Sequence, residues 1–186
     1  MPLLRKGGEP HEVSVAMTGV RLGDRLLQLG CANPKLLGAI ASKVGISGHA
    51  AVLVTDAAAA ARAAREAARA GVLVEIEQAR SLHAPYEDGS FDLVVVDNTG
   101  NQLGPSNGTG CTAWFREMQR LLVPRGRLVA IDAAGRGAFS ALFKAAAART
   151  ESAAGGATAT ALKSAGFRSV RTLAERDGLV FTEGVK

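Results

Sequence analysis

Residues 85–98 read PYEDGSFDLVVVDN, and this stretch decides the fold. Its second half, Phe91 to Val96, is rich in β-branched and aromatic residues and is the most strand-like segment of the chain. Pro85, Asp88 and Gly89 mark a turn just before it. We expect this strand at the centre of a sheet, with the rest of the chain arranged on both sides of it.

Short apolar runs alternate with longer segments that suit helices, which is typical of an α/β sheet with helices on its faces. The predicted strands are 26–29, 51–55, 72–76, 91–96, 127–132, 169–175 and 179–182, and the predicted helices are 35–44, 57–70, 112–122, 139–148 and one that ends at Ala165. Gly155 and Gly156 are expected in a loose segment before that last helix. Residues 176–178, Arg-Asp-Gly, are expected to join the last two strands as a short hairpin turn.

The length of 186 residues is that of one domain, and no internal repeat or linker divides the chain. We expect a single domain over residues 1–186, in which 1–19 form a short N-terminal extension. Hydrophobic residues make up 47% and charged residues 21%, which excludes a wholly disordered chain. No apolar run approaches the ~18 residues of a membrane span, and the N-terminus lacks a signal-like apolar region. We therefore expect a soluble, cytoplasmic protein.

The formal net charge is +5, from 22 basic and 17 acidic residues, which raises the question of nucleic-acid binding. The basic residues are spread along the chain with acids interleaved, and even the densest group, 116–127, contains Glu117. Because phosphate-binding surfaces usually concentrate positive charge, we expect no nucleic-acid partner. Cys31 and Cys111 lie far apart without a CxxC motif or a Cys/His cluster, so free thiols and no metal site are predicted.

Small and polar residues follow the predicted strands at their carboxyl ends, where open parallel sheets bind ligands. Gly30 follows the first strand, Asp56 the second and Asp97 the fourth, and Ser81 lies beyond the third. A small residue lets a ligand approach the backbone, and an acid after the second strand can accept from both hydroxyls of a ribose. The pattern indicates a nucleoside-binding edge, although a turn glycine and a strand-end acid are explained equally well as structural residues.

Motifs of several other nucleotide-binding and hydrolytic classes are absent from the sequence. A dinucleotide fingerprint needs G-x-G-x-x-G, whereas Gly30, Ala32 and Lys35 occupy those positions here. The chain contains neither the phosphate-binding P-loop motif nor the GxSxG elbow of esterases. Dehydrogenase, nucleotide-hydrolase and esterase functions are therefore not supported.

Three longer motifs resemble class I S-adenosylmethionine-dependent methyltransferases, and within them the small-molecule enzymes of the ubiquinone and menaquinone biosynthesis type. The motifs are GDRLLQLGC at 23–31, PYEDGSFDLV at 85–94 and REMQRLLVPRGRL at 116–128. The last two are similar to the family's LPFxDxSFDLV and RExxRVLxPGGxL patterns, and AGF at 165–167 fits its C-terminal region. The resemblance runs from about Val20 to Lys186. It implies a Rossmann-like, doubly wound, seven-stranded sheet, mostly parallel with a C-terminal antiparallel hairpin.

The same resemblance implies S-adenosylmethionine as the cofactor and methyl transfer to a small-molecule acceptor as the reaction. The cofactor-binding residues that it implies are Gln28, Gly30, Cys31, Ala32, Asp56, Ala57, Arg80, Ser81 and Asp97. Gly30 matches the first glycine of the family's loop, and Asp56 matches its ribose-binding acid. The chain departs from the family at four positions: Ala32 and Pro34 replace glycines, Gln28 replaces an acid, and Arg80 replaces an aspartate that accepts from adenine.

These departures leave two interpretations of function open. One is a working methyltransferase, and the alternative is a degenerate relative with weak or no cofactor binding that serves as a binding or assembly module. In the first, His83 and Asp97, followed by His11, are the candidates to deprotonate an acceptor hydroxyl, although His83 is also explained as a solvated loop histidine. A base is optional because the leaving group is neutral. Residues 7–18, the loop 98–110 or a second subunit are the candidate covers of the acceptor site, so a homodimer stays open.

Overall fold

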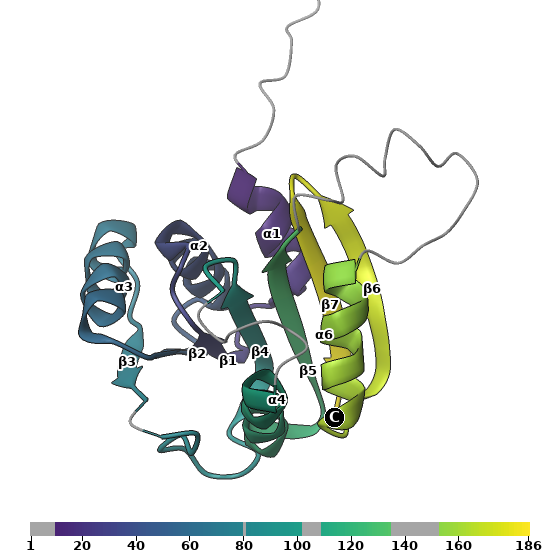
Figure 1. Cartoon of the computed structure of the whole chain (residues 1–186). Helices are drawn as coiled ribbons and strands as arrows, with labels where there is room; N and C mark the ends of the chain where they lie inside the picture. The colour runs from purple at the N-terminus through teal and green to yellow at the C-terminus, as the bar shows by residue number, and fades with distance from the viewer. Residues whose placement is uncertain (1–9, 80, 102–108, 135–152) are drawn as a thin grey trace, which may run out of the picture.

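Helices and strands alternate along the computed structural model, which describes residues 10–79, 81–101, 109–134 and 153–186 (Figure 1). The helices are α1 (Pro10–Thr18), α2 (Pro34–Val44), α3 (Ala57–Ala70), α4 (Thr109–Leu121) and α6 (Ala153–Ser164). The strands are β1 (Arg25–Leu29), β2 (His49–Val54), β3 (Glu75–Gln78), β4 (Phe91–Asn98), β5 (Leu122–Ala133), β6 (Arg168–Arg176) and β7 (Leu179–Val185). The predicted helix 139–148 lies outside the described residues.

The seven strands form one sheet in the order β3-β2-β1-β4-β5-β7-β6. Strands β1 to β5 are parallel, whereas β7 is antiparallel to both β5 and β6. This confirms the predicted doubly wound α/β sheet with its C-terminal antiparallel hairpin. The chain runs outward from β1 to β3 and then returns to add β4 on the other side of β1, so the strand order reverses between β1 and β4. Ligands of open parallel sheets bind at the carboxyl ends of the strands at such a reversal.

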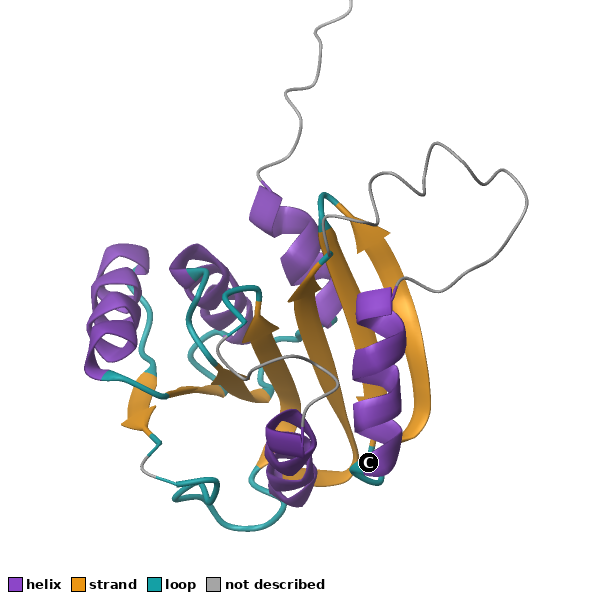
Figure 2. Cartoon of the chain, in the orientation of Figure 1, coloured by secondary structure: helices purple, strands orange, loops and turns teal. Residues whose placement is uncertain are grey.

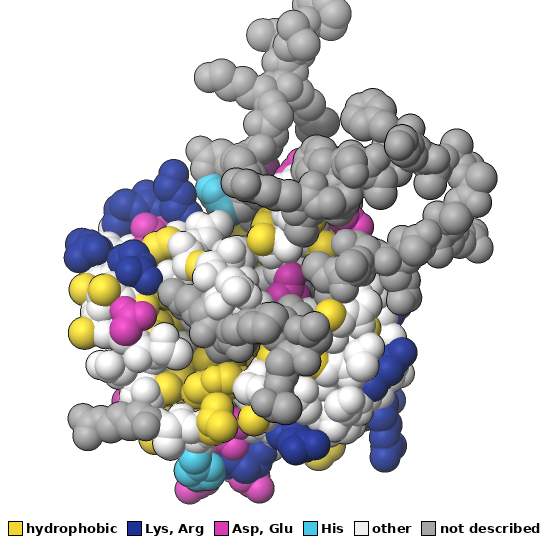
Figure 3. Space-filling view, in the orientation of Figure 1, with side chains coloured by type: hydrophobic (Ala, Val, Ile, Leu, Met, Phe, Trp, Pro, Cys, Tyr) yellow, Lys and Arg dark blue, Asp and Glu magenta, His cyan; other side chains and the backbone are white. Residues whose placement is uncertain are grey.

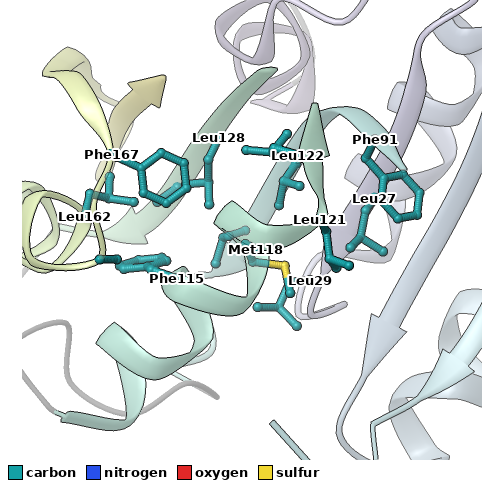
Figure 4. Close-up of a cluster of buried hydrophobic side chains, with 14 of the residues drawn as sticks. Leu27, Leu29, Phe91, Phe115, Met118, Leu121, Leu122, Leu128, Leu162 and Phe167 are labelled. Carbon is teal, nitrogen blue, oxygen red and sulfur yellow. The ribbon is translucent and has the colours of Figure 1, made fainter. Parts of the chain in front are cut away.

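Strand β4 is the most deeply covered strand of the sheet, because seven of its eight residues are buried. Its alternate side chains enter two separate cores. Val94 and Val96 pack with residues of α4 and α6, whereas Leu93 and Val95 pack with residues of α1 and α2. Figure 4 shows the first core, in which Met118 and Phe115 of α4 face leucines of the strands. In Figure 2 the strands, in orange, form a twisted layer with helices on both faces.

Gly155 and Gly156 lie inside helix α6, so the prediction of a loose segment there is wrong. The reason is close packing against the C-terminal hairpin. A Cβ at Gly155 would lie 3.0 Å from Val180 Cγ1 and 3.2 Å from Thr172 Oγ1. The glycine lets the helix axis approach the strands, and this contact outweighs the low helix propensity of glycine.

Three other boundaries differ from the prediction. Strand β3 starts at Glu75 rather than Val72, because its first partner on β2 is Ala51. Strand β5 starts at Leu122 rather than Arg127, because residues 124–126 form an irregularity within the strand, where Arg125 has a φ of +67°. Helix α1 occupies half of the N-terminal extension for which no element was predicted. The hairpin turn is confirmed, with positive φ angles at Asp177 and Gly178 as a type I′ turn requires.

The REMQR part of the third motif forms a clasp that holds the connection between β3 and β4 against α4. Arg120 donates to Glu117, to Asp88 Oδ1 at 2.6 Å, and to the backbone oxygens of Ala84 and Tyr86. Glu117 is buried and also accepts from Ala84 N at 2.7 Å. Burial opposes ionisation of Glu117, but the bonds from Arg120 and from Ala84 N outweigh it and lower the pKa of the carboxyl. The clasp therefore fixes a connection that contains no helix or strand of its own.

Replacing Arg120 by Met is expected to lower the free energy of unfolding by about 2–4 kcal/mol, because the buried charge of Glu117 loses its partner. Chemical denaturation of the purified variant measures this loss. Arg116→Met is the matched control, since Arg116 is exposed on the same helix. Equal stability of the two variants would contradict the role assigned to the clasp.

Three carboxyl groups make stability depend on acid pH. Hydrogen bonds from Arg69 to Glu66 and from Arg25 to Asp92 lower the pKa of each acceptor, as the clasp does for Glu117. A carboxyl with a lower pKa in the folded state contributes stability above its unfolded pKa of about 4, and this is lost as pH falls through the folded pKa. We expect the free energy of unfolding to decline below about pH 5, with a smaller slope in Glu117→Gln. Urea titrations at a series of pH values measure both slopes.

Candidate functional site

The turn after β1 lies at the carboxyl ends of the strands where the strand order reverses, the place that we call the crevice because open parallel sheets bind ligands there. Gly30 has a φ of +85°, a conformation in which a side chain is strained, and its N–H donates to Leu53 O on β2 at 2.9 Å. Asn33 caps α2, and Pro34 takes the first helical position, where a helix needs no backbone N–H. The proline that replaces a family glycine is therefore part of a well-formed helix start. No described residue accepts a hydrogen bond from the N–H groups of Cys31, which is buried, and of Ala32, which is half-buried.

Asp97, at the end of β4, ties this turn to the strand beside it. Its carboxylate is wholly buried, and Oδ2 accepts from Asn33 N at 2.7 Å. The other oxygen accepts from Thr99 N and, at 2.6 Å, from Thr99 Oγ1. Three donors thus satisfy the charge, and both oxygens are engaged by the protein itself. Asp97 therefore holds the turn after β1 in place, and neither of its oxygens is left free to take a proton from a ligand.

Gln28, which replaces the family's acid, is buried on β1 below the same turn. Its Nε2 donates to Gly30 O at 2.9 Å, and this bond fixes the orientation of the amide. Oε1 is buried and has no hydrogen-bond partner among the described residues. A buried acceptor without a donor costs about 1–3 kcal/mol. A donor brought by a ligand or by water would recover this cost.

Asp56 follows β2 and caps helix α3, because its Oδ1 accepts from Ala59 N at 2.7 Å. The residue is exposed, and no described donor is bonded to its second oxygen. Ala57, the first residue of α3, is exposed beside it. An outward carboxylate oxygen is therefore presented at the carboxyl end of β2, next to the turn after β1.

The loop after β3 carries Ser81 and His83, while Arg80 lies outside the described residues. Ser81 Oγ accepts from His83 N at 3.2 Å, and both residues are exposed. His83 Nδ1 lies 3.4 Å from Glu117 Oε1, so the imidazole is joined to the clasp on α4. The structure therefore does not bring the two predicted proton acceptors, His83 and Asp97, into one group. His11 lies on α1, at a groove between α1 and α2.

A buried polar network beside the crevice was not predicted from the sequence. Asp132, at the end of β5, accepts from Asn98 Nδ2 at 2.8 Å and from Thr158 Oγ1 at 2.7 Å. Asp97 and Asn98 are neighbours on β4, so their side chains point to opposite faces of the sheet, and the network lies on the face of α6. Asp132 lies at the carboxyl end of its strand, as Asp97 does and as Asp56 does just beyond β2, and that position was the signal that could have found it.

Both cysteines are buried free thiols, as predicted. Burial raises the pKa of Cys31 to about 11, with a further contribution from the charge of Asp97. Burial also raises the pKa of Cys111 to about 11, and here Asp132 adds to the effect. Neither thiol is a nucleophile at neutral pH.

Comparison with protein-family models gives a match to a methyltransferase domain over residues 22–176. The chain belongs to this methyltransferase-domain family. The match spans the crevice, the clasp and most of the sheet of this methyltransferase-domain protein. No curated protein matches the chain.

Solved structures of similar fold include a SAM-dependent methyltransferase from Aquifex aeolicus, with a TM-score of 0.72 and 15% identity over 95% of this chain and 89% of the other. A SAM-dependent O-methyltransferase from Thermotoga maritima has a TM-score of 0.68 and 13% identity, covering 100% of this chain and 67% of the other. The cyclase SpnF has a TM-score of 0.68 and 15% identity, covering 95% of this chain and 79% of the other. These likenesses show the methyltransferase fold.

The family implies S-adenosylmethionine as the cofactor, and the crevice contains groups that fit it. Cys31 and Ala32 offer backbone donors for a carboxylate, Asp56 offers an acceptor for ribose hydroxyls, and Gln28 offers an orphaned buried acceptor. Ala32 adds only a methyl group where the family has glycine. The donors and acceptors on β1 and β2 therefore suit the cofactor in kind.

Two further properties bear on ligands and partners. The described residues contain no cluster of three or more His, Cys, Asp or Glu that could hold a metal ion, and none of their helices is long and apolar enough to cross a membrane. On the face shown in Figure 3, the Lys and Arg side chains, in dark blue, lie in separate groups and not in one stripe.

Replacing Asp97 by Asn is expected to destabilise the protein by about 2–4 kcal/mol, because an amide NH2 would face one of the donors Asn33 N or Thr99 N. Hydrogen exchange at Asn33 and Leu36 is expected to accelerate more than exchange in β7. Protection that stays unchanged at the start of α2 would show that Asp97 does not hold the turn.

Proposed function

We propose that this protein is an S-adenosylmethionine-dependent methyltransferase that acts on a small-molecule acceptor. The observation that carries the proposal is the juxtaposition, at the carboxyl ends of β1 and β2, of two unengaged backbone N–H groups and the outward carboxylate of Asp56. The N–H groups suit an anionic carboxylate, and Asp56 suits a pair of ribose hydroxyls. S-adenosylmethionine carries both groups, a free amino-acid carboxylate at one end and the ribose hydroxyls of its nucleoside at the other.

The cofactor, when bound, supplies an electrophilic methyl group attached to a sulfonium. Transfer of that methyl group leaves a neutral thioether. The residues of the chain then have to bind, orient and exclude water, and these effects carry most of the rate of such a displacement. Asp97 contributes by fixing the turn that carries Cys31 and Ala32. Ala57, Ser81 and Arg80 are proposed to line the nucleoside side of the crevice.

A dedicated protein base is not part of the proposal. Both oxygens of Asp97 already accept hydrogen bonds, and His83 is joined to Glu117 of the clasp. An acceptor whose nucleophile is deprotonated by water, or is already neutral and unprotonated, suits such a site. The motifs at 85–94 and 116–128 favour an acceptor of the kind handled by ubiquinone and menaquinone biosynthesis enzymes.

The alternative, a cofactor-poor binding or assembly module, is favoured by one specific observation. Gln28 is neutral where the family has an acid, and its buried Oε1 receives no hydrogen bond from any residue that the structure describes. If no ligand supplies a donor, the unsatisfied oxygen lowers the stability of the protein by about 1–3 kcal/mol. Binding of a ligand with a donor would recover this free energy.

Isothermal titration calorimetry with S-adenosylmethionine and S-adenosylhomocysteine tests the proposal. We expect micromolar dissociation constants for the natural protein and a loss of at least about tenfold in Asp56→Asn. Asparagine still caps α3 through its single carbonyl oxygen, so the fold is retained while the outward acceptor and its charge are lost. Thermal denaturation of the variant verifies that retention.

Asp177→Asn is the matched control, because it removes one exposed carboxylate in the distant hairpin turn and tolerates the positive φ there. Its affinity is expected to equal that of the natural protein. Absence of heat with either ligand at millimolar concentration would favour the binding-module alternative. Equal binding by Asp56→Asn and the natural protein would overturn the role of Asp56 alone.

A further inference from the structure

Three large hydrophobic side chains are almost fully exposed on loops that lead into neighbouring strands. The exposed fractions are 75% for Leu22, 105% for Ile46 and 94% for Leu73. Among the described residues only one other large hydrophobic side chain, Leu82, is exposed, at 49%. Single exposed apolar residues are common on protein surfaces, but a group at one end of the molecule indicates a contact surface.

The register of the sheet places the three residues along one edge. Leu22 and Ile46 each lie three positions before β1 and β2, and Leu73 lies two positions before β3. These strands are parallel neighbours, with Arg25 paired to His49 and Ala51 to Glu75. Their amino ends therefore share an edge, which we call the leucine–isoleucine edge, formed by Leu22, Ile46 and Leu73.

The loops of this edge are held in place by hydrogen bonds, so the side chains are presented outward. Gly23 N donates to Val44 O at 2.9 Å, and Arg21 N donates to Asp24 Oδ2 at 2.8 Å. A Cβ at Gly45 would lie only 2.5 Å from Leu22 Cδ1, so the first two loops touch. The glycine makes room for the neighbouring leucine without allowing it to be buried.

Charges around the edge are mostly paired, and the excess is positive. Arg25 pairs with Asp92 and Arg69 with Glu66, and His49 Nε2 lies 3.2 Å from Glu75 Oε2. Two more cations, Arg21 and Lys43, are exposed next to the loops and form no ion pair with a described residue. Among the described residues near the loops, Asp24 is a carboxylate without an ion pair. Its Oδ2 accepts a hydrogen bond from the backbone N–H of Arg21. The edge thus combines protruding apolar side chains with unpaired basic ones.

We propose that the leucine–isoleucine edge docks the protein on an anionic lipid surface. Three side chains offer roughly 500 Å² at most, below the roughly 800 Å² that each partner contributes to a standard protein interface, which disfavours a stable dimer through this edge. Separate loop tips insert individually between headgroups and need no complementary partner surface. Basic residues beside them, in a chain with a net charge of +5, are attracted to anionic headgroups.

Docking through this edge leaves the candidate site accessible. The edge lies at the amino ends of β1 to β3, whereas the turn after β1, Asp56 and Asp97 lie at the carboxyl ends. The crevice would face away from the membrane, and a ligand would reach it from the aqueous phase. The proposal does not depend on the proposed function, because it concerns the opposite end of the sheet.

Vesicle flotation with the full chain tests the proposal. The natural protein is expected to float with vesicles of phosphatidylcholine and phosphatidylserine in a 7:3 ratio, and less with phosphatidylcholine alone, at low and physiological salt. The triple variant Leu22→Ser, Ile46→Ser, Leu73→Ser is expected to lower the bound fraction at least about tenfold. The double variant Arg21→Gln, Lys43→Gln is expected to reduce the difference between the two vesicle types.

Leu82→Ser is the matched control, since it removes the exposed hydrophobic side chain outside the edge, and its binding is expected to equal that of the natural protein. Circular dichroism verifies that each variant is folded. Failure to float with either vesicle, or flotation of the triple variant like the natural protein, would overturn the proposal. Light scattering would also overturn the proposal if the mass rose with protein concentration and fell to that of the monomer in the triple variant. The edge would then bind a second copy of the chain and not lipid.

Discussion

The carboxylate of Asp97 is buried away from water, and the centre of the molecule is arranged to supply it with hydrogen-bond donors. An ionised group without exposure has to receive hydrogen bonds from the protein, and here the donors come from Asn33 at the start of α2 and from Thr99, the residue after β4. The turn after β1 consequently has one conformation, with Gly30 at a positive φ and Pro34 opening the helix. The hydrogen bond from Asn33 N to Asp97 therefore fixes the position of the turn after β1, which carries the N–H groups of Cys31 and Ala32.

The clasp around Glu117 and Arg120 solves a related problem on the other side of the sheet. The described residues of the connection from β3 to β4 form no helix, and the guanidinium of Arg120 donates to two of their carbonyl oxygens, those of Ala84 and Tyr86. The motif at 116–128 therefore contributes to stability through the clasp. The polar residues of the crevice, which differ more from the family, carry what is particular to this protein.

Features set by local pattern could be predicted from the sequence, and features set by distant contacts could not. The apolar run at 91–96, the alanine-rich helix 57–70 and the Asp-Gly turn each contain their own signal, and the structure has all three. The helical state of Gly155 depends on Val180 and Thr172, which no window around the glycine includes. Likewise, Asp56, Asp97 and Asp132 all lie at or just beyond the carboxyl ends of strands, yet one is exposed and two are buried in different networks. Which acid faces a ligand is decided by donors far away in sequence.

The two buried thiols make the protein suitable for site-specific chemical labelling. With pKa values of about 11, Cys31 and Cys111 are ionised to the order of one part in several thousand near pH 7.5, and their burial blocks reagents as well. These are the only cysteines of the chain. A cysteine introduced on the surface would therefore react with a maleimide fluorophore almost alone, in the otherwise natural sequence.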